Sequence, residues 1–135
     1  MSDLLTMSST RKMTMQMFSA TEQLMIGGRG FSISFKNQYS ISVQWGAMNY
    51  CDNRHFNKPY SNTPFACADA EVMIAWDGRG VSSHNFPRMM KCWADKFDTS
   101  GIATHMTPDE VGELIGDVQR EMDAPTLETE NALSE

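Results

Sequence analysis

The chain has 135 residues, of which 41% are hydrophobic and 21% are charged, and this size and composition fit one folded domain with a modest core. Its formal net charge of -6 argues against a general nucleic-acid-binding protein, which needs a basic face to displace counterions from phosphate. Most of that charge comes from acidic residues at and after Glu121, and we therefore expect a disordered acidic tail over residues 123–135.

The first 17 residues are rich in Ser, Thr and Met and show no clear period, which favours a flexible arm. A short helix over 13–17 is an alternative, because Met is a fair helix former. The N-terminus lacks the basic and apolar regions of a signal peptide, and no apolar run reaches the roughly 20 residues that cross a bilayer. We expect a cytoplasmic protein with no membrane partner, whose three cysteines are reduced thiols: Cys51, Cys67 and Cys92.

Two segments, 30–36 and 39–46, alternate strictly between apolar and polar residues. The three residues between them include Asn37, which tolerates a left-handed conformation in a tight turn. Two period-2 runs joined this closely predict an antiparallel hairpin over about 29–46 with one buried face. The apolar members of that face are Phe31, Ile33, Phe35, Ile41, Val43 and Trp45.

The segment 47–65 loses this period and has the composition of a loop, with recurrent Asn and two prolines. Residues 67–77 are apolar on both faces, which is typical of a central strand. A turn at 77–80 follows, with Gly78 and Gly80 suited to positive φ. After it we expect a short strand over 81–86, a helix over 87–97 with Pro87 at its first position, and a connector over 98–106.

The last element is a helix with a capping box, in which Thr107 is the N-cap, Pro108 the first helical residue and Glu110 the reciprocal partner. Its predicted apolar stripe is Val111, Leu114, Ile115, Val118 and Met122.

These elements predict an α+β fold: an antiparallel sheet built on the hairpin and the central strand, with one or two helices packed on it. A single globular domain is expected over 18–122, between the arm of residues 1–17 and the tail. A strand that is apolar on both faces in so short a chain also predicts a homo-oligomer, most simply a two-fold dimer.

Polar and aromatic side chains crowd together directly after the second strand of the hairpin, and a similar group follows the turn at 77–80. An aromatic ring can stack on a base, an amide can read its edge, and an arginine can pair with phosphate. We therefore predict a nucleotide-binding site, completed from the same chain or from a neighbouring subunit, from these residues: Asn49, Tyr50, Asn53, Arg54, Arg79, Asn85, Phe86 and Arg88. The alternative is that Tyr50 and Phe86 belong to the core, the Asn residues form turns and the Arg residues are solvated.

No catalytic or metal-binding signature stands out in the sequence. The Gly-rich segment at 27–30 precedes a strand rather than a helix, so it favours a turn over a phosphate loop. The histidines do not pair at a metal-ligand spacing, and the cysteines are too irregularly spaced for a zinc motif. We expect no metal and no cofactor. A nucleophilic pair of Cys51 with His55 or His84 stays open as an alternative.

Three segments carry a resemblance to a known group: "GFSISFKNQYSISVQWGAMNYCDNR", "AEVMIAWDGRG" and "TPDEV". They resemble small proteins encoded by bacteriophages and prophages, over roughly residues 29–120. The chain is similar to the Thoeris anti-defence sponges, which bind cyclic ADP-ribose-type signals or cyclic oligonucleotides without cleaving them.

The resemblance implies a counter-defence protein of the infected bacterial cytoplasm that sequesters a nucleotide-derived small-molecule signal and is not an enzyme. A second hypothesis is a protein-interaction inhibitor of a host defence complex such as a CRISPR effector, with the methionines and the acidic tail as its contact surface. A cysteine-dependent enzyme is the third.

Overall fold

The two alternating runs of the sequence form the predicted antiparallel hairpin. The computed structural model describes residues 14–20, 27–54 and 62–126, and in it β2 (Gly30–Ser34) pairs with β3 (Tyr39–Gln44). Residues 39–44 are alternately buried and half-buried, as expected for a strand with one face on the core.

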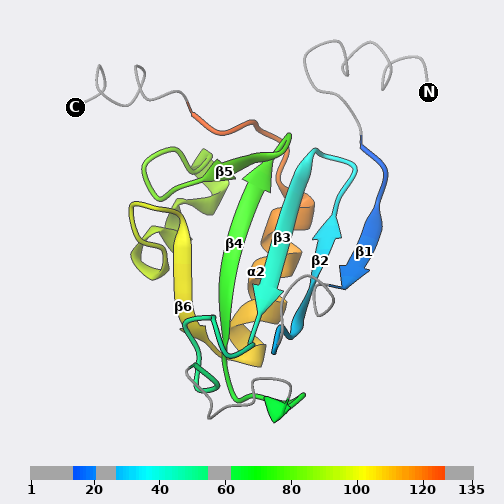
Figure 1. Cartoon of the computed structure of the whole chain (residues 1–135). Coiled ribbons are helices and arrows are strands. Elements are labelled where there is room, and N and C mark those ends of the chain that lie inside the picture. Colours follow the sequence, from blue (N-terminus) through cyan, green and yellow to red (C-terminus); the bar gives the residue numbers. More distant parts are fainter. Residues whose placement is uncertain (1–13, 21–26, 55–61, 127–135) are drawn as a thin grey trace.

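The predicted central strand is β4 (Ala70–Trp76), which is paired along both of its edges. One edge pairs with β3. The other is shared by β5 (Arg79–Val81) near the end of β4 and by β6 (Ile102–Met106) near its start. With β1 (Met17–Ala20) beside β2, the sheet has six antiparallel strands in the order β1-β2-β3-β4-β5, with β6 also on β4 (Figure 1).

One face of this sheet carries the core, because the buried apolar residues of β3 and β4 point to it, whereas Met73 and Ala75 of β4 point to the other face. Helix α2 (Pro108–Arg120) lies across this face, behind β3 in the view of Figure 1, and the 3-10 helix η3 (Arg88–Lys96) packs beside it. The expected α+β architecture is therefore confirmed. The most deeply buried apolar residues include Tyr39, Ile41, Val72, Ile74, Val81, Phe86, Met90, Ala103, Leu114 and Val118.

Both ends of α2 are fixed by side chains. At its start the predicted capping box is present: Thr107 Oγ1 accepts from Glu110 N at 3.2 Å, and Glu110 Oε1 accepts from Thr107 N at 3.0 Å. At its end, buried Asn37 of the β2–β3 turn donates from Nδ2 to the carbonyl oxygens of Val118 and Glu121, each at 2.9 Å. The hairpin turn thus supplies a donor to carbonyl oxygens at the C-terminal end of the helix.

The sequence misplaced several other elements. The segment 98–106, expected to be a connector, contains β6. Its residues do not alternate regularly between buried and exposed, because the β4–β6 register shifts and His105 takes a φ of 52°. The strand expected over 81–86 includes only Val81, because residues 82–85 form a turn. Pro87 has an extended ψ of 160° and is the N-cap of η3 rather than its first residue.

Three further expectations at the ends and turns were also wrong. Thr14–Gln16 are not helical, and Met17 begins β1, whose uniformly exposed residues gave no apolar alternation to detect. In the hairpin turn it is Gln38, with φ 77°, that takes the left-handed conformation instead of Asn37. In the turn after β4 the positive φ values belong to Asp77 and Gly78, while Gly80 lies in β5.

The end of α2 departs from the predicted stripe as well. Met122 lies beyond the helix and is 62% exposed, because α2 stops at Arg120. The chain then runs back over the body: the Tyr39 hydroxyl donates to Asp123 O at 2.7 Å, and Thr126 N donates to Asn85 O at 3.0 Å. Residues 127–135 of the expected tail lie outside the described residues.

An ion pair joins η3 to α2, and it predicts that the stability of the folded state falls at acidic pH. Lys96 Nζ lies 2.8 Å from Glu110 Oε2, and the hydrogen bond from this ammonium lowers the pKa of Glu110 from 4.5 to about 2. Since the pKa is lower in the folded state, the stabilisation is fully present above pH 4.5 and is lost as the pH falls towards 2.

We expect Glu110→Gln to lower the melting temperature at neutral pH and to flatten the fall in melting temperature between pH 4.5 and 2. Calorimetry across this pH range measures both effects. Glu113→Gln is the charge-matched control, because Glu113 is exposed on the same helix. Melting curves for Glu110→Gln that run parallel to those of the wild type would contradict the assignment.

Candidate functional site

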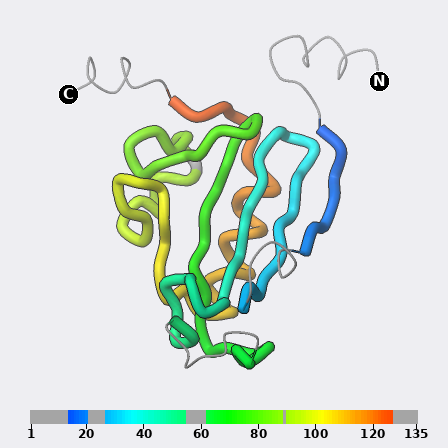
Figure 2. Tube along the Cα trace, in the orientation of Figure 1, coloured from blue at the N-terminus to red at the C-terminus, as the bar shows by residue number. Residues whose placement is uncertain are grey.

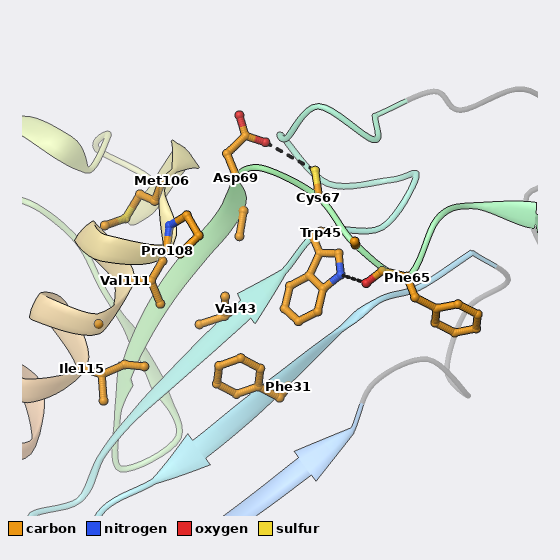
Figure 3. A pocket seen from close by; sticks show the side chains of 13 residues that line it. Phe31, Val43, Trp45, Phe65, Cys67, Asp69, Met106, Pro108, Val111 and Ile115 are labelled. Atoms are coloured by element: carbon orange, nitrogen blue, oxygen red, sulfur yellow. Dashed lines mark hydrogen bonds between the residues drawn. The ribbon is translucent and has the colours of Figure 1, made fainter.

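A cavity of about 400 Å³ opens where α2 leaves part of the sheet uncovered (Figure 3). Phe31 of β2 and Val43 of β3 form its floor, and α2 supplies a wall through Val111 and Ile115. The chain from Phe65 to Ala70 closes the opposite side. Cavities of this size and predominantly apolar lining commonly hold small ligands.

The aromatic wall of the cavity is held in a fixed orientation. The rings of Phe31 and Trp45 meet edge to face, with centroids 6.0 Å apart, and Trp45 Nε1 donates to Phe65 O at 2.8 Å. The Phe65 side chain is 75% exposed at the rim, and the Arg29 guanidinium lies 4.1 Å from the centroid of its ring. Because these groups hold one another in place, a flat ligand would meet a preformed surface.

Polar groups of the lining gather on one side, at Cys67 and Asp69. Asp69 Oδ1 accepts from Asp52 N at 2.7 Å. It also accepts from Cys67 Sγ at 3.5 Å, as Figure 3 shows. A carboxylate has further lone pairs, so Asp69 can still accept from a ligand or bind a cation.

The loop after β3 holds the first half of the predicted site, and two of its side chains tie the loop together. Asn49 Oδ1 accepts from Gly46 N at 2.9 Å, and its Nδ2 donates to Glu71 Oε1 at 3.3 Å. Asn53 is buried, and its Nδ2 donates to Trp45 O at 2.8 Å and to the carbonyl oxygens of Pro64 and Ala66 at 3.4 Å each. These amides form hydrogen bonds with the loop backbone and with Glu71, as expected if the Asn residues stabilise turns.

Tyr50 and Arg54 form a pair on the surface of the same loop. The Arg54 guanidinium lies over the Tyr50 ring, 3.9 Å from its centroid, and Nη1 donates to Met48 O at 3.1 Å. Tyr50 is 44% exposed, and neither side chain lines the cavity. The pair therefore offers an aromatic edge and guanidinium N–H groups to solvent.

The second half of the predicted site lies at the other end of β4, roughly 20 Å away along a strand of this length (Figure 2). Phe86 is fully buried and packs edge to face on Phe97, with ring centroids 5.1 Å apart. Asn85 Oδ1 accepts from Ser82 N at 2.9 Å and closes a turn, while Arg79 and Arg88 are exposed. Within one chain the two halves do not form one site; their completion by a neighbouring subunit stays a prediction.

The structure also separates Cys51 from His84, one of the two histidines considered as its catalytic partner. His84 lies in the turn at 82–85, at the opposite end of β4 from Cys51, and His55 lies outside the described residues. Burial raises the pKa of the Cys51 thiol to about 11, which keeps it protonated at neutral pH.

Side chains of the types that can bind a metal ion lie close together at the polar side of the cavity, although their spacing in the sequence matches no metal-binding motif. The ligand atoms of Cys51, Cys67 and Asp69 all lie within 4.8 Å of one another, and so do those of Asp52, Asp69 and His105. Asp69 belongs to both groups.

Most residues that line the cavity could not be predicted from local sequence patterns. Phe31 and Trp45 alternate with polar neighbours as core residues do, and the position of α2 leaves them half-buried. Cys67, Asp69 and His105 come together through strand pairing between distant segments, which no local spacing reveals.

Comparison of the chain with protein-family models, with curated proteins and with solved structures finds no match. Among the described residues, no helix combines the length and the apolar character that crossing a membrane requires.

The buried amide of Asn53 generates a prediction, because it joins the loop after β3 to the segment that closes the cavity. Asn53→Ala removes a buried donor that bonds to the carbonyls of Trp45, Pro64 and Ala66, so we expect a loss of about 1–3 kcal/mol in the free energy of unfolding. Denaturant titration measures it. Asn62→Ala, at an exposed position in the same region, is the control. Equal stabilities of the two variants would show that Asn53 does not hold the loops.

Proposed function

We propose that the protein is a non-enzymatic binding protein that takes the base of a nucleotide-derived signal into the cavity and holds it without cleaving it. The observation that carries this proposal is the cavity itself: about 400 Å³, apolar, and walled by the fixed rings of Phe31 and Trp45 opposite α2. A planar base can bury its apolar faces in such a cavity. Stacking on an aromatic side chain is open to any base, because every base has a π-face.

Asp69 supports a role in orienting the base. Its carboxylate lines the cavity and accepts from exocyclic amino groups, which adenine, guanine and cytosine all carry. An apolar cavity with one polar side is the usual arrangement of small-molecule sites, in which the apolar area gives affinity and the polar group gives orientation.

Arg54 supports phosphate binding outside the cavity. Its loop is joined through Asn53 to the segment that closes the cavity. The stacked guanidinium makes one hydrogen bond, to Met48 O, among the described residues. Its remaining N–H groups suit the oxygens of a phosphate, which accept a planar fork of donors.

Sequestration also accords with the thiol chemistry. A nucleophilic cysteine needs a lowered pKa, whereas burial raises that of Cys51. A protein of this kind would act in the cytoplasm of an infected bacterial host, as the resemblance to phage-encoded sponges implies.

A protein-interaction inhibitor is the second candidate, and exposed apolar side chains favour it. Phe18 on β1 is 82% exposed, Met15 77% and Phe65 75%. Large exposed apolar side chains are available to a partner protein, and an aromatic side chain of a partner would also fit the cavity.

The expected homo-oligomer stays a prediction, with β1 as the proposed contact. β1 pairs only with β2 among the described residues, and its Met17 and Phe18 are exposed. A second copy pairing along this edge would extend the sheet and cover both side chains.

Gly112 allows a test of the cavity with little risk to the fold. It lines the cavity, and a Cβ added there meets nothing within 4 Å. We expect Gly112→Leu to fill the cavity and abolish ligand binding while keeping or raising the melting temperature, since Gly disfavours a helix by about 1 kcal/mol. Gly116→Ala is the control on the same helix, because Gly116 lies outside the lining.

The assay is a thermal-shift and calorimetric screen of cyclic ADP-ribose-type and cyclic oligonucleotide ligands, followed by mass spectrometry of the ligand released on heat denaturation. Intact released ligand supports sequestration, and a converted ligand would identify an enzyme. If no nucleotide binds, or if Gly112→Leu binds one as tightly as the wild type, the proposal is wrong. Capture of a defence protein instead would favour the second candidate.

Arg54 gives an independent prediction for the phosphate. Arg54→Ala should weaken binding by about 1.5 to 3 kcal/mol, the scale of a hydrogen bond to a charged group, which is about tenfold or more in affinity. Arg54→Lys should restore only part, because an ammonium lacks the planar fork. Isothermal titration measures both variants. A destabilised Arg54→Ala with unchanged affinity would show that Arg54 only supports its loop.

A further inference from the structure

At the polar side of the cavity lies a cluster of side chains that shares Asp69 with the proposed nucleotide site and adds ligands which that site does not use. We propose that Cys51, Cys67, Asp69 and His105 form a binding site for one divalent transition-metal ion of the Zn²⁺ type, which displaces the protons of both thiols to solvent as it binds. The ligand atoms of Cys51, Cys67 and Asp69 lie within 4.8 Å of one another, and His105 lies equally close to Asp69. Asp69 therefore stands between the two thiols and the imidazole.

The donor set selects the kind of ion. Two sulfur atoms and an imidazole nitrogen suit Zn²⁺ and similar ions, whereas Mg²⁺ and Ca²⁺ prefer oxygen ligands alone. Bonds of about 2.3 Å to sulfur and roughly 2.0–2.2 Å to nitrogen or oxygen place tetrahedral ligand atoms roughly 3.3 to 3.8 Å apart. Within each of the two groups the ligand atoms start within 4.8 Å of one another, so each group needs to close by roughly 1 to 1.5 Å. A site with all four ligands also requires the His105 imidazole to move towards the thiols.

Three separate segments supply these ligands, and their backbones are already held together. Asp52 N donates to Asp69 Oδ1 at 2.7 Å, which joins the loop of Cys51 to the segment of Cys67. His105 N donates to Tyr50 O at 3.1 Å, which joins the end of β6 to the same loop (Figure 2). Binding an ion would therefore require little reorganisation of the chain.

The degree of burial suits a site that an ion can enter. Cys51 is only 2% exposed, Cys67 and Asp69 are half-buried, and His105 is exposed. Asp52 is also exposed and close to Asp69 and His105, so it is available as an alternative carboxylate ligand. The site stands on these contacts and does not depend on the binding of a nucleotide.

The test uses the full chain, purified under reducing conditions and freed of metal with a chelator. Zn²⁺ is titrated against a chromophoric chelator, and Co²⁺ is added as a spectroscopic probe. We expect one ion per chain, a near-ultraviolet charge-transfer band from thiolate to cobalt, and the intense visible bands of a tetrahedral Co²⁺ site. Zn²⁺ should also raise the melting temperature, because it binds the folded state.

Variants separate this site from adventitious binding. Cys67→Ser and His105→Gln should each weaken Zn²⁺ affinity at least tenfold, and Cys67→Ser should also reduce the charge-transfer band. Cys92→Ser is the matched control, because Cys92 is an exposed cysteine on η3, away from the cluster. Both test positions are more exposed than Cys51, so folding of the variants is not at risk from core disruption. Gly112→Leu should bind the ion as the wild type does, which separates the metal from the cavity ligand.

Three results would overturn the proposal. The first is a chain that retains no Zn²⁺ in competition with the chelator. The second is Co²⁺ binding without a thiolate band, or with a band that Cys92→Ser alone removes. The third is a disulfide between Cys51 and Cys67 in the protein as isolated, seen as two missing thiols by mass spectrometry, because it would occupy both sulfur ligands.

Discussion

The antiparallel register of β3 against β4 is the constraint on which the candidate site depends. It places Gln44 opposite Glu71, so the chain leaving β3 and the chain entering β4 emerge side by side at one end of the sheet. Buried Glu71 then accepts from Tyr50 N at 2.9 Å, which turns the departing loop back across the start of β4. A shift of this pairing by one residue would reverse every side chain and separate both loops from the core.

The placement of α2 follows from contacts at its two ends and explains why a cavity exists. The capping box at Thr107 fixes the start of the helix directly after β6, and Asn37 holds its end against the β2–β3 turn. A helix held at both points lies over β3 and cannot also cover β2 and β1. Phe31 and Ile33 are consequently half-buried although they belong to the apolar face. The cavity is the space that this helix leaves beside Phe31.

Three elements could be predicted from the sequence because their patterns lie within a short segment. The hairpin, β4 and the capped helix follow from period-2 alternation and a capping box, each complete within a short segment. β1 and β6 were not predicted because neither shows a regular apolar alternation: β1 is exposed throughout, and β6 is irregular at His105. The two halves of the predicted site were grouped by residue type, and type alone says nothing about which end of β4 a residue follows.

Hydrogen bonding separates the polar residues that tie the loops from those that remain available to a ligand. The amides of Asn49 and Asn53 are directed at the backbone and at Glu71, so their abundance after β3 reflects the need to satisfy a loop folded against a sheet. Arg54 and Asp69 differ, because each retains donors or acceptors beyond the contacts that position it. The same loops thus bring a cation and an anion to one end of the sheet, next to an apolar cavity. A ligand with a flat apolar body, an amino group and a negative charge would match all three at once.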